Sequence, residues 1–340
     1  MSFPAASGRR RPVTQEDVAR AVGVSRTLVS FAFRGAPGVS PETRDAILEA
    51  ARRLGYRQNV LAAGLASKRA SAVGLYLLDL HNEVYADIFA GVSEALSDGG
   101  HRLILGVTDS PSGSGRAAAD SLIEARIGVL IAATLTDPDA YVRELTQTVP
   151  VVNVARLVSG VDSIYSDDRA GASAAVSHLL GLGHRRIAHM AGPPHEGHLE
   201  RRRTYERLMV AAGLEPRVVQ AQDYTQEAAE RAAHALLAAP ERPTAVFAHN
   251  DELALGVREA AYALGLRVPQ DLSLIGYDNS RLARLHGIDL TSVDLHAREL
   301  GKAAGEAALQ RLAQPEAPAM ERRSEPHLVL RASTGAPARS

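Results

Sequence analysis

From residue 72 onward, short apolar runs typical of strands alternate with longer segments typical of helices, and this alternation strongly limits the possible folds. Strands that alternate with helices form parallel sheets, because each helix carries the chain back to the start of the next strand. The segment is too long for one sheet, so we predict two doubly wound subdomains with a ligand cleft between them, at the carboxyl ends of the strands. The apolar runs lie at 72–78, 103–107, 127–132, 149–154, 186–191, 244–248 and 272–276.

The stretch 14–34 predicts two short helices joined by a tight turn. Thr14 precedes Asp17 by three residues, which is the spacing of a capping box at the start of a helix. Gly23 ends this first helix, and Ser25 is placed to cap the second. The second helix keeps its apolar side chains on one side. Its opposite face carries residues whose helical spacing suits a groove of DNA: Thr27, Ser30, Phe31 and Arg34.

A third helix follows this pair. The tripeptide Ser-Pro-Glu at 40–42 supplies an N-cap, a proline at the first helical position and an acid in the first turn, and the helix runs through Leu54 to end at Gly55. Three helices make a small DNA-binding unit. Residues 58–66 then form a short segment capable of helix, and a Lys-Arg-Ala-Ser linker follows it.

Positive charge is concentrated in the first 70 residues. Residues 1–70 hold 12 lysines or arginines against 5 aspartates or glutamates, a net charge of +7, whereas residues 71–340 hold 26 against 34, a net charge of −8. Phosphate neutralisation requires such an excess, although a merely solvated basic terminus is the alternative. We therefore predict that the N-terminal part binds a polyanion. The cationic side chains include Arg9, Arg10, Arg11, Arg52, Arg53, Arg57, Lys68 and Arg69.

Composition excludes several other classes of protein. The sequence has no cysteine, so it has neither a disulfide framework nor a thiolate zinc site. It has no run of about 18 apolar residues, and its first residues lack the apolar core of a signal peptide. We expect a cytoplasmic protein that does not enter a membrane.

The sequence also lacks the motifs of common enzymes. There is no G-x-x-x-x-G-K-[ST], no strand-linked G-x-G-x-x-G and no G-x-S-x-G. Histidines at 184, 189, 195 and 198 invite a metal site, but the loop around His195 and His198 is flanked by glycine and proline, unlike a metallohydrolase helix. We predict no catalytic residue, no metal site and no cofactor beyond a small-molecule effector.

Several separated motifs together resemble the lactose-repressor/galactose-repressor (LacI/GalR) family over nearly the entire chain. The resemblance implies an N-terminal three-helix helix-turn-helix domain plus hinge helix, and an α/β two-lobed periplasmic-binding-protein-like core with two doubly wound parallel sheets. It implies a sequence-specific transcriptional regulator, a repressor, whose operator affinity is controlled by a small ligand. The motifs are D-V-A at 17–19, G-V-S at 23–25, V-S at 29–30, P-G-V-S-P-E-T-R at 37–44, L-G-Y-R at 54–57, D-L-H-N at 79–82, G-H-R-R-I-A at 183–188, P-T-A-V-F-A-H-N-D at 243–251 and V-P-Q-D-L-S-L-I-G-Y-D at 268–278.

In such repressors the second helix lies in the major groove, and its early residues read base edges. Arg26 is the best candidate for specificity, because a two-point contact from arginine to guanine contributes about 1–3 kcal/mol of discrimination. Phe31 offers apolar contact, for instance to a thymine methyl, or folds back into the core. The predicted DNA-binding residues are Thr14, Ser25, Arg26, Thr27, Ser30, Phe31, Arg34, Asn59, Leu65 and Ala66.

The family's hinge helix wedges a leucine between base pairs in the minor groove, and Leu65 matches that leucine. Two positions depart from the family pattern: Gln58 replaces the usual proline before Asn59, and Ala63 replaces a commonly basic residue. We therefore expect a weaker hinge. Ordinary packing of Leu65 against its own helix is the alternative.

The resemblance also implies ligand-binding residues in the cleft. Three positions depart from the family pattern. The family's frequent N-P-F-F is here N-E-V-Y at 82–85, the acid before Arg156 is Ala155, and a glutamine is replaced by Leu295. The last two changes argue against an ordinary pentose or hexose. The predicted effector-binding residues are Asn82, Tyr85, Arg156, Asp167, Asp168, Arg201, Asn250, Asp251 and Asp278.

These side chains suit a polyol or another hydroxylated ligand, because carboxylates and amides exchange directed hydrogen bonds with hydroxyls while an aromatic ring covers an apolar face. The two arginines also allow an anionic group, either phosphate or carboxylate. Each residue has a purely structural alternative. Asp167 or Asp251 can cap a helix, and Arg156 or Arg201 can form an exposed ion pair.

The resemblance implies a homodimer on roughly palindromic double-stranded operator DNA. The ending R-A-S-T-G at 331–335 is followed by no leucine heptads, so a dimer is favoured over a tetramer. A periplasmic sugar-binding protein is the competing interpretation, but it would need a signal peptide and would not use residues 14–65. Repression or activation, and release or promotion of DNA binding by the ligand, stay open.

We expect these boundaries: a flexible basic tail at 1–12, the helix-turn-helix domain at 13–57, a hinge helix and linker at 58–71, and an effector-binding and dimerisation core at 72–340. Within the core, lobe 1 spans about 72–164 and 294–324, and lobe 2 spans about 165–290 and 325–340.

Overall fold

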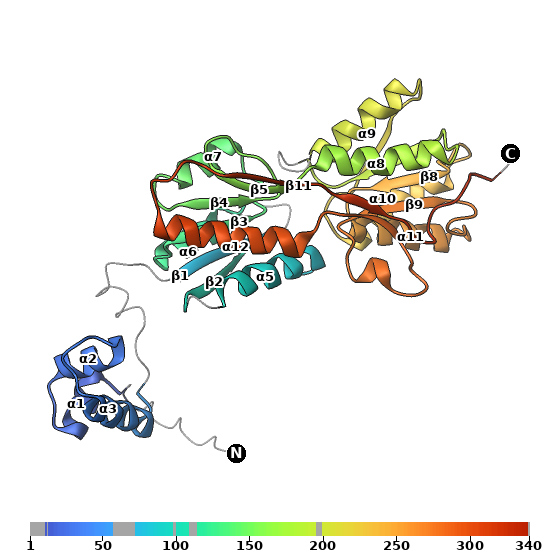
Figure 1. Ribbon diagram of the computed structural model, residues 1–340. Helices are drawn as coiled ribbons and strands as arrows, with labels where there is room; N and C mark the ends of the chain where they lie inside the picture. Colours follow the sequence, from blue (N-terminus) through green and yellow to red (C-terminus); the bar gives the residue numbers. More distant parts are fainter. Residues whose placement is uncertain are drawn as a thin grey trace, which may run out of the picture. The chain divides into compact units, whose positions relative to one another are not determined.

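The computed structural model describes residues 11, 13–56, 72–97, 100–108, 114–194 and 199–338. The chain divides into two compact units, Met1–Arg69 and Ala70–Ser340, and we describe each by itself (Figure 1). Within the described ranges, no helix combines the length and the apolar character needed to cross a lipid bilayer.

The first unit contains three helices, as the sequence predicts: α1 (Gln15–Val22), α2 (Arg26–Arg34) and α3 (Pro41–Leu54). The predicted capping box forms, since Thr14 accepts a hydrogen bond from the Asp17 amide and Asp17 accepts one from the Thr14 amide. Gly23 ends α1 with φ 74°, a left-handed conformation that glycine adopts without strain. The three helices bury Val18, Val29 and Ile47 in a common core.

The second unit contains two six-stranded sheets, as expected from the alternating pattern. The first sheet has the order β11-β5-β4-β3-β1-β2, and its neighbouring strands are all parallel. We call this sheet and its helices lobe 1. Its strands are β1 (Ala72–Leu77), β2 (Arg102–Val107), β3 (Val129–Ala133), β4 (Val151–Val154), β5 (Asp162–Ser166) and β11 (Glu321–Ser324), and its helices are α5 (Glu83–Leu96), α6 (Arg116–Glu124), α7 (Asp139–Leu145) and α12 (Ala297–Ala313).

The second sheet has the order β12-β10-β9-β8-β6-β7, and β12 runs antiparallel to β10 at one edge. We call this sheet and its helices lobe 2. Its strands are β6 (Ile187–Ala191), β7 (Arg217–Gln220), β8 (Ala245–Ala248), β9 (Ser273–Tyr277), β10 (Thr291–Asp294) and β12 (His327–Val329). Its helices are α8 (Asp168–Gly181), α9 (Leu199–Ala211), α10 (Gln226–Ala238), α11 (Asp251–Ala263) and the short 3-10 helix η2 (Leu282–Arg284).

Both sheets are covered on both faces, which explains why their central strands are continuously apolar. In lobe 1, α5 and α12 lie side by side over one face (Figure 1). The two helices approach closely because each has a glycine at the contact: a Cβ on Gly91 would lie 2.0 Å from the Arg298 carbonyl oxygen, and one on Gly301 would lie 2.1 Å from that of Ile88. The site described below begins at the N-terminus of α5.

Each of the seven apolar runs identified in the sequence overlaps a strand. The sequence analysis did not identify β5, β7, β10, β11 and β12. The missed strands are short and rich in polar residues, and β7, β11 and β12 lie at sheet edges where half-exposed side chains are tolerated. In β10 the polar residues Thr291 and Ser292 are fully buried but hydrogen-bonded, so their burial leaves no apolar pattern in the sequence.

Candidate DNA-binding surface and ligand cleft

The N-terminal half of α2 forms an exposed polar surface. Arg26 and Thr27 are exposed in its first turn, and the exposed Ser25 caps it by accepting a hydrogen bond from the Leu28 amide at 3.2 Å. Val29, on the other side of the helix, is fully buried. The surface that the sequence predicts to read DNA is therefore presented outward.

The flanking predicted residues are less accessible. Ser30 and Phe31 are half-buried, and Thr14 is half-buried at the start of α1. Phe31 is therefore neither fully exposed for contact with DNA nor fully folded back into the core, which are the two alternatives that the sequence left open. The predicted hinge residues Asn59, Leu65 and Ala66, and the side chain of Arg34, lie outside the part of the chain that the structure describes.

The charges at the helix starts differ in a way that matters for DNA. Glu16 and Asp17 lie in the first turn of α1 and Glu42 in that of α3, whereas the first turn of α2 has no acidic residue. A carboxylate there would repel the phosphates of a groove, while Arg26 attracts them. The electrostatics of α2 thus suit an approach to DNA.

In the second unit, a cleft opens at the carboxyl ends of strands from both sheets, where the sequence predicts it. Residues that follow β1, β3, β4 and β5 line its lobe 1 side, and residues that follow β8 and β9 line its lobe 2 side. Six of the nine predicted effector-binding residues meet here: Asn82, Tyr85, Asp168, Arg201, Asn250 and Asp278.

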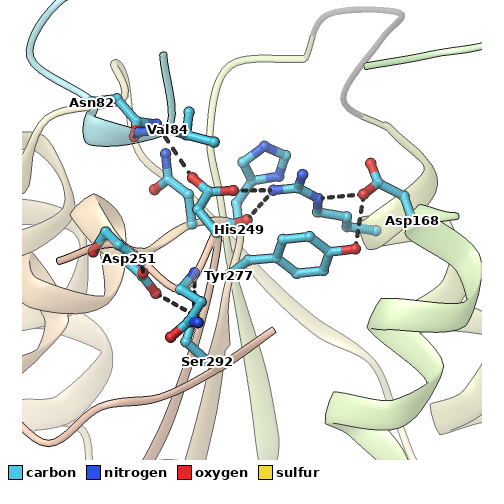
Figure 2. Close-up of polar contacts among 12 residues, drawn as sticks. Asn82, Val84, Asp168, His249, Asp251, Tyr277 and Ser292 are labelled. Carbon is cyan, nitrogen blue, oxygen red and sulfur yellow. Dashed lines mark hydrogen bonds and ion pairs between the residues drawn. The ribbon is translucent and has the colours of Figure 1, made fainter. Parts of the chain in front are cut away.

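Arg201 is the centre of the ionic network in the cleft. Figure 2 labels three of the residues that surround it, Asp168, His249 and Tyr277. Its Nε donates to Asp168 at 3.1 Å, its Nη1 donates to the His249 carbonyl oxygen at 2.6 Å, and the same Nη1 lies 3.7 Å from Asp278. Its guanidinium carbon stacks 3.6 Å from the centre of the Tyr277 ring. The nearby carboxylates raise the pKa of Arg201, so its charge is permanent. The guanidinium is held rigidly by partners of its own chain.

Asp278 links the two lobes. Its carboxylate accepts a hydrogen bond from Asn82 Nδ2 at 3.3 Å, and Asn82 caps α5 in lobe 1. Burial raises the pKa of Asp278 to about 8, and the neighbouring carboxylates of Asp251 and Asp168 add to the effect while Arg201 opposes it. Asp278 also has φ 98°, a strained conformation for an L-residue that is concentrated at functional sites.

Comparison with known proteins identifies the family. Residues 14–59 match the model of the bacterial regulatory proteins of the lacI family, and residues 176–334 match the periplasmic binding protein-like domain. The catabolite control protein A of Priestia megaterium is 35% identical over 300 residues, which cover 86% of this chain and 90% of that protein. The chain belongs to the lacI family of bacterial regulatory proteins.

Two solved structures extend this result over nearly the full length. The lac repressor dimer bound to operator and the anti-inducer ONPF superposes with a TM-score of 0.82 at 26% identity, covering 96% of this chain and 100% of that one. The complex of the transcriptional regulator CelR with cellobiose gives a TM-score of 0.68 at 29% identity, covering 95% and 100%. The chain is thus a DNA-binding transcriptional regulator with a helix-turn-helix unit and a periplasmic-binding-protein-like core.

Three residues that the lacI-family resemblance placed in the effector set do not line this cleft. Asp251 points beneath it, where its carboxylate accepts hydrogen bonds from the Ser292 hydroxyl at 2.7 Å and the Ser280 amide at 2.7 Å (Figure 2). Gly276 permits this position, since a Cβ there would lie 2.0 Å from Asp251 Oδ1. Burial raises the pKa of Asp251 to about 6. Asp251 therefore supports the loop that carries Asp278.

Asp167 and Arg156 lie in a neighbouring open groove instead. Asp167 caps α8 by accepting from the Ala170 amide at 2.9 Å, as its structural alternative predicted, and it also pairs with Arg323. Arg156 turns toward lobe 1, where it bonds Asp139 and the carbonyl oxygens of Leu135 and Asp137. The guanidinium of Arg156 therefore bonds residues of lobe 1 and not a ligand in the cleft.

Several cleft residues were not predicted from the sequence. Ser166 is the last residue of β5 and directly precedes the Asp-Asp pair, and His249 lies inside the H-N-D motif. Their closeness to a motif could have indicated both residues. Thr134 and Tyr224 lie near no motif, and only the tertiary fold brings them in. The other unpredicted residues are mostly aliphatic, and all of them except Leu295 come from lobe 1.

The histidines that invited a metal interpretation have structural partners. His184 bonds Thr244, Ser273 and the Gly335 carbonyl oxygen, and the buried His189 bonds the carbonyl oxygen of Phe247. Burial lowers the pKa of His189 to about 4. Among the residues that the structure describes, no group of three or more His, Cys, Asp or Glu is arranged to hold a metal ion, and His195 and His198 lie outside them.

Proposed function

We propose that this regulator is a repressor whose homodimer binds operator DNA through α2 and whose operator affinity is set by a small hydroxylated ligand in the cleft. The observation that carries the proposal is the pairing of an outward, acid-free reading surface with a separate cleft where Asn82, Arg201 and Asp278 converge from two lobes. The lac repressor and CelR comparisons support operator and sugar as the two ligands. A protein that binds chromosomal DNA acts in the cytoplasm, and the proposal includes no catalysed reaction.

Contacts across the cleft suggest how a ligand would act. Besides the Asn82–Asp278 bond, Glu83 of lobe 1 accepts a hydrogen bond from the Leu282 amide of lobe 2 at 3.1 Å and lies 3.4 Å from Arg281. A ligand that bonds Asn82 and Asp278 directly changes the relative stability of open and closed lobes. Because it binds the two states differently, it shifts the dimer toward or away from the state that binds DNA.

We retain the boundaries expected from the sequence, with the helix-turn-helix domain at 13–57, the linker at 58–71 and the core from 72. The predicted contacts of Arg26, Thr27 and Phe31 with bases, and of Leu65 with the operator centre, belong to this proposal. Asp167, Arg156 and Asp251 act in it as supports of the cleft.

Deletion of residues 1–70 tests the division of labour. An operator is first selected with the full chain from random DNA. The truncated protein should lose binding to that operator and still show a rise in melting temperature with ligand, since a ligand at 100 times its dissociation constant stabilises a protein by about 2.7 kcal/mol. Specific operator binding by the truncated protein would refute the assignment of DNA binding to the first unit.

A further inference from the structure

The walls of the cleft differ in chemistry. The aliphatic residues that line it come from lobe 1, except Leu295, which lies in the connection between β10 of lobe 2 and α12 of lobe 1. The other lining residues of lobe 2 all carry a polar group. The lobe 2 set is Asp168, Arg201, Tyr224, His249, Asn250 and Asp278. The main aliphatic residues are Leu78, Val84, Ile88, Val154, Leu295 and Leu300. A ligand that fills the cleft therefore meets an apolar surface on one side and hydrogen-bonding groups on the other.

The polar groups of the lobe 1 wall are mostly occupied by their own lobe. Asp79 accepts a hydrogen bond from the His81 amide at 2.8 Å, Asn82 caps α5, and the Tyr85 hydroxyl bonds Thr134. In addition, Ala155 and Leu295 stand at positions where the family resemblance implies an acid and a glutamine. This side of the cleft therefore offers few directed hydrogen bonds to a ligand.

The cleft has no cation available for an anionic ligand. Arg201 is the only arginine or lysine among the described residues that line it, and it already interacts with the carboxylates of Asp168 and Asp278. Asp79 is a further acidic residue of the lining. The acidic side chains of Asp79 and Asp168, together with a guanidinium that is already bonded to Asp168, disfavour a phosphate or carboxylate group. Arg156, which the sequence offered as a second anion-binding residue, points elsewhere.

Ser166 marks where a polar part of the ligand would lie. Its hydroxyl oxygen is buried and has no hydrogen-bond partner among the described residues, and it lines the cleft at the end of β5, two residues before Asp168. An unsatisfied buried hydroxyl is unfavourable, so a ligand group that bonds it gains affinity. Ser166 lies where the apolar wall of lobe 1 meets the polar wall of lobe 2.

We propose that the effector is an uncharged amphipathic molecule, with a hydroxylated ring held by lobe 2 and Ser166 and an apolar substituent packed against the lobe 1 wall. This inference rests on the proposed function, because it specifies the ligand of the same cleft. Glycosides with an aromatic or alkyl aglycone belong to this class. Free sugars, which have no apolar substituent, and phosphorylated sugars, which carry a charge, do not.

Matched ligands test the inference on the full chain. Glucose, galactose, mannose, xylose and ribose are each measured by titration calorimetry as the free sugar, the phenyl glycoside and the phosphate ester. For the configuration that binds, the phenyl glycoside should bind at least about tenfold more tightly than the free sugar, because the ring buries apolar area, and the phosphate ester should not bind detectably. Equal or tighter binding of the free sugar or the phosphate ester would overturn the inference.

Variants locate the apolar contact. Leu295→Gln should bring the ratio between phenyl glycoside and free sugar close to one, while Leu295→Met, which keeps an apolar side chain of similar volume, should preserve it. Leu330→Gln is the matched control, because Leu330 is 60% exposed and does not line the cleft. If the ratio of affinities for phenyl glycoside and free sugar were unchanged in Leu295→Gln, the inference that an apolar substituent packs against this wall would be overturned, but the proposed function would stand. Binding that also survives Arg201→Ala would place the ligand outside the cleft and overturn the proposed function as well.

Discussion

The DNA-binding surface and the ligand cleft use polar side chains in opposite ways. On α2, Arg26 and Thr27 are exposed on a helix whose stability comes from the buried opposite face. In the cleft, the side chain of Arg201 is 12% exposed and is held by Asp168 and Asp278. A change on α2 should therefore alter recognition without altering stability, whereas a change in the cleft should alter both. The predictions below test this difference.

The largest effect is expected from Arg201→Met. The substitution leaves Asp168, which Arg201 contacts at 3.1 Å, buried without its cation, and breaking such a buried pair costs about 3–5 kcal/mol. Urea unfolding of the full chain measures the loss. Arg202→Met is the matched control on the same helix, because Arg202 forms a half-exposed pair with Glu206 and should cost at most about 1 kcal/mol. Similar losses of stability in Arg201→Met and Arg202→Met would contradict the claim that the buried cleft residue matters more for stability than an exposed residue of the same helix.

Arg26→Ala should act on recognition alone. Loss of a two-point contact to guanine costs about 1–3 kcal/mol, which is roughly a 5- to 150-fold loss of affinity for the selected operator, and the urea midpoint should not move. Fluorescence anisotropy with the operator and with one guanine replaced measures the loss. Arg52→Ala, at an exposed position on α3, should weaken both DNAs equally. Preserved discrimination in Arg26→Ala would remove that residue from the reading surface.

The cleft should also make stability depend on pH. The pKa of Asp278 is raised to about 8 in the folded chain from its ordinary value near 3.8, so the folded state holds a proton that the unfolded state has released. The stabilisation is full at low pH and is lost as pH rises through about 8. The urea midpoint should therefore fall between pH 7 and pH 9, a range above the pKa of about 6 of Asp251.

Asp278→Asn is the control for this pH dependence, since an amide cannot ionise. Its urea midpoint should change less between pH 7 and pH 9 than that of the unmodified chain. An identical fall in both proteins would assign the dependence to other groups.

The smallest effect is expected at Glu83, which joins the lobes. Glu83→Ala removes the acceptor of the Leu282 amide and the exposed pair with Arg281, contacts that together contribute at most about 1–2 kcal/mol. Hydrogen exchange should show faster exchange at Leu282, with no change at amides of the sheet cores. Glu83→Gln keeps the acceptor and should retain protection. Unchanged exchange in Glu83→Ala would show that this bond does not join the lobes in solution.

The sequence predicted best where local pattern and tertiary fold agree. The caps of α1 and α2 and the seven apolar strands depend on residues close together in the chain, and they appear as predicted. The cleft lies at the carboxyl ends of the strands, as the general rule for parallel sheets predicts. Asp251 and Arg156 were placed in the cleft by the family resemblance, but the direction of a side chain depends on partners from distant segments. Ser292 holds Asp251, and Asp139 holds Arg156. Tyr224 reaches the cleft only through the fold of lobe 2.

The central claim is that a ligand in the cleft controls DNA binding by α2. The most direct measurement is the dissociation constant for the selected operator, with and without the tightest ligand from the calorimetric panel, for the unmodified chain and for Asp278→Asn. The account predicts that the ligand changes the constant of the unmodified chain by about 5- to 150-fold and that of Asp278→Asn by much less. An equal change in both proteins, or none in the unmodified chain, would contradict it.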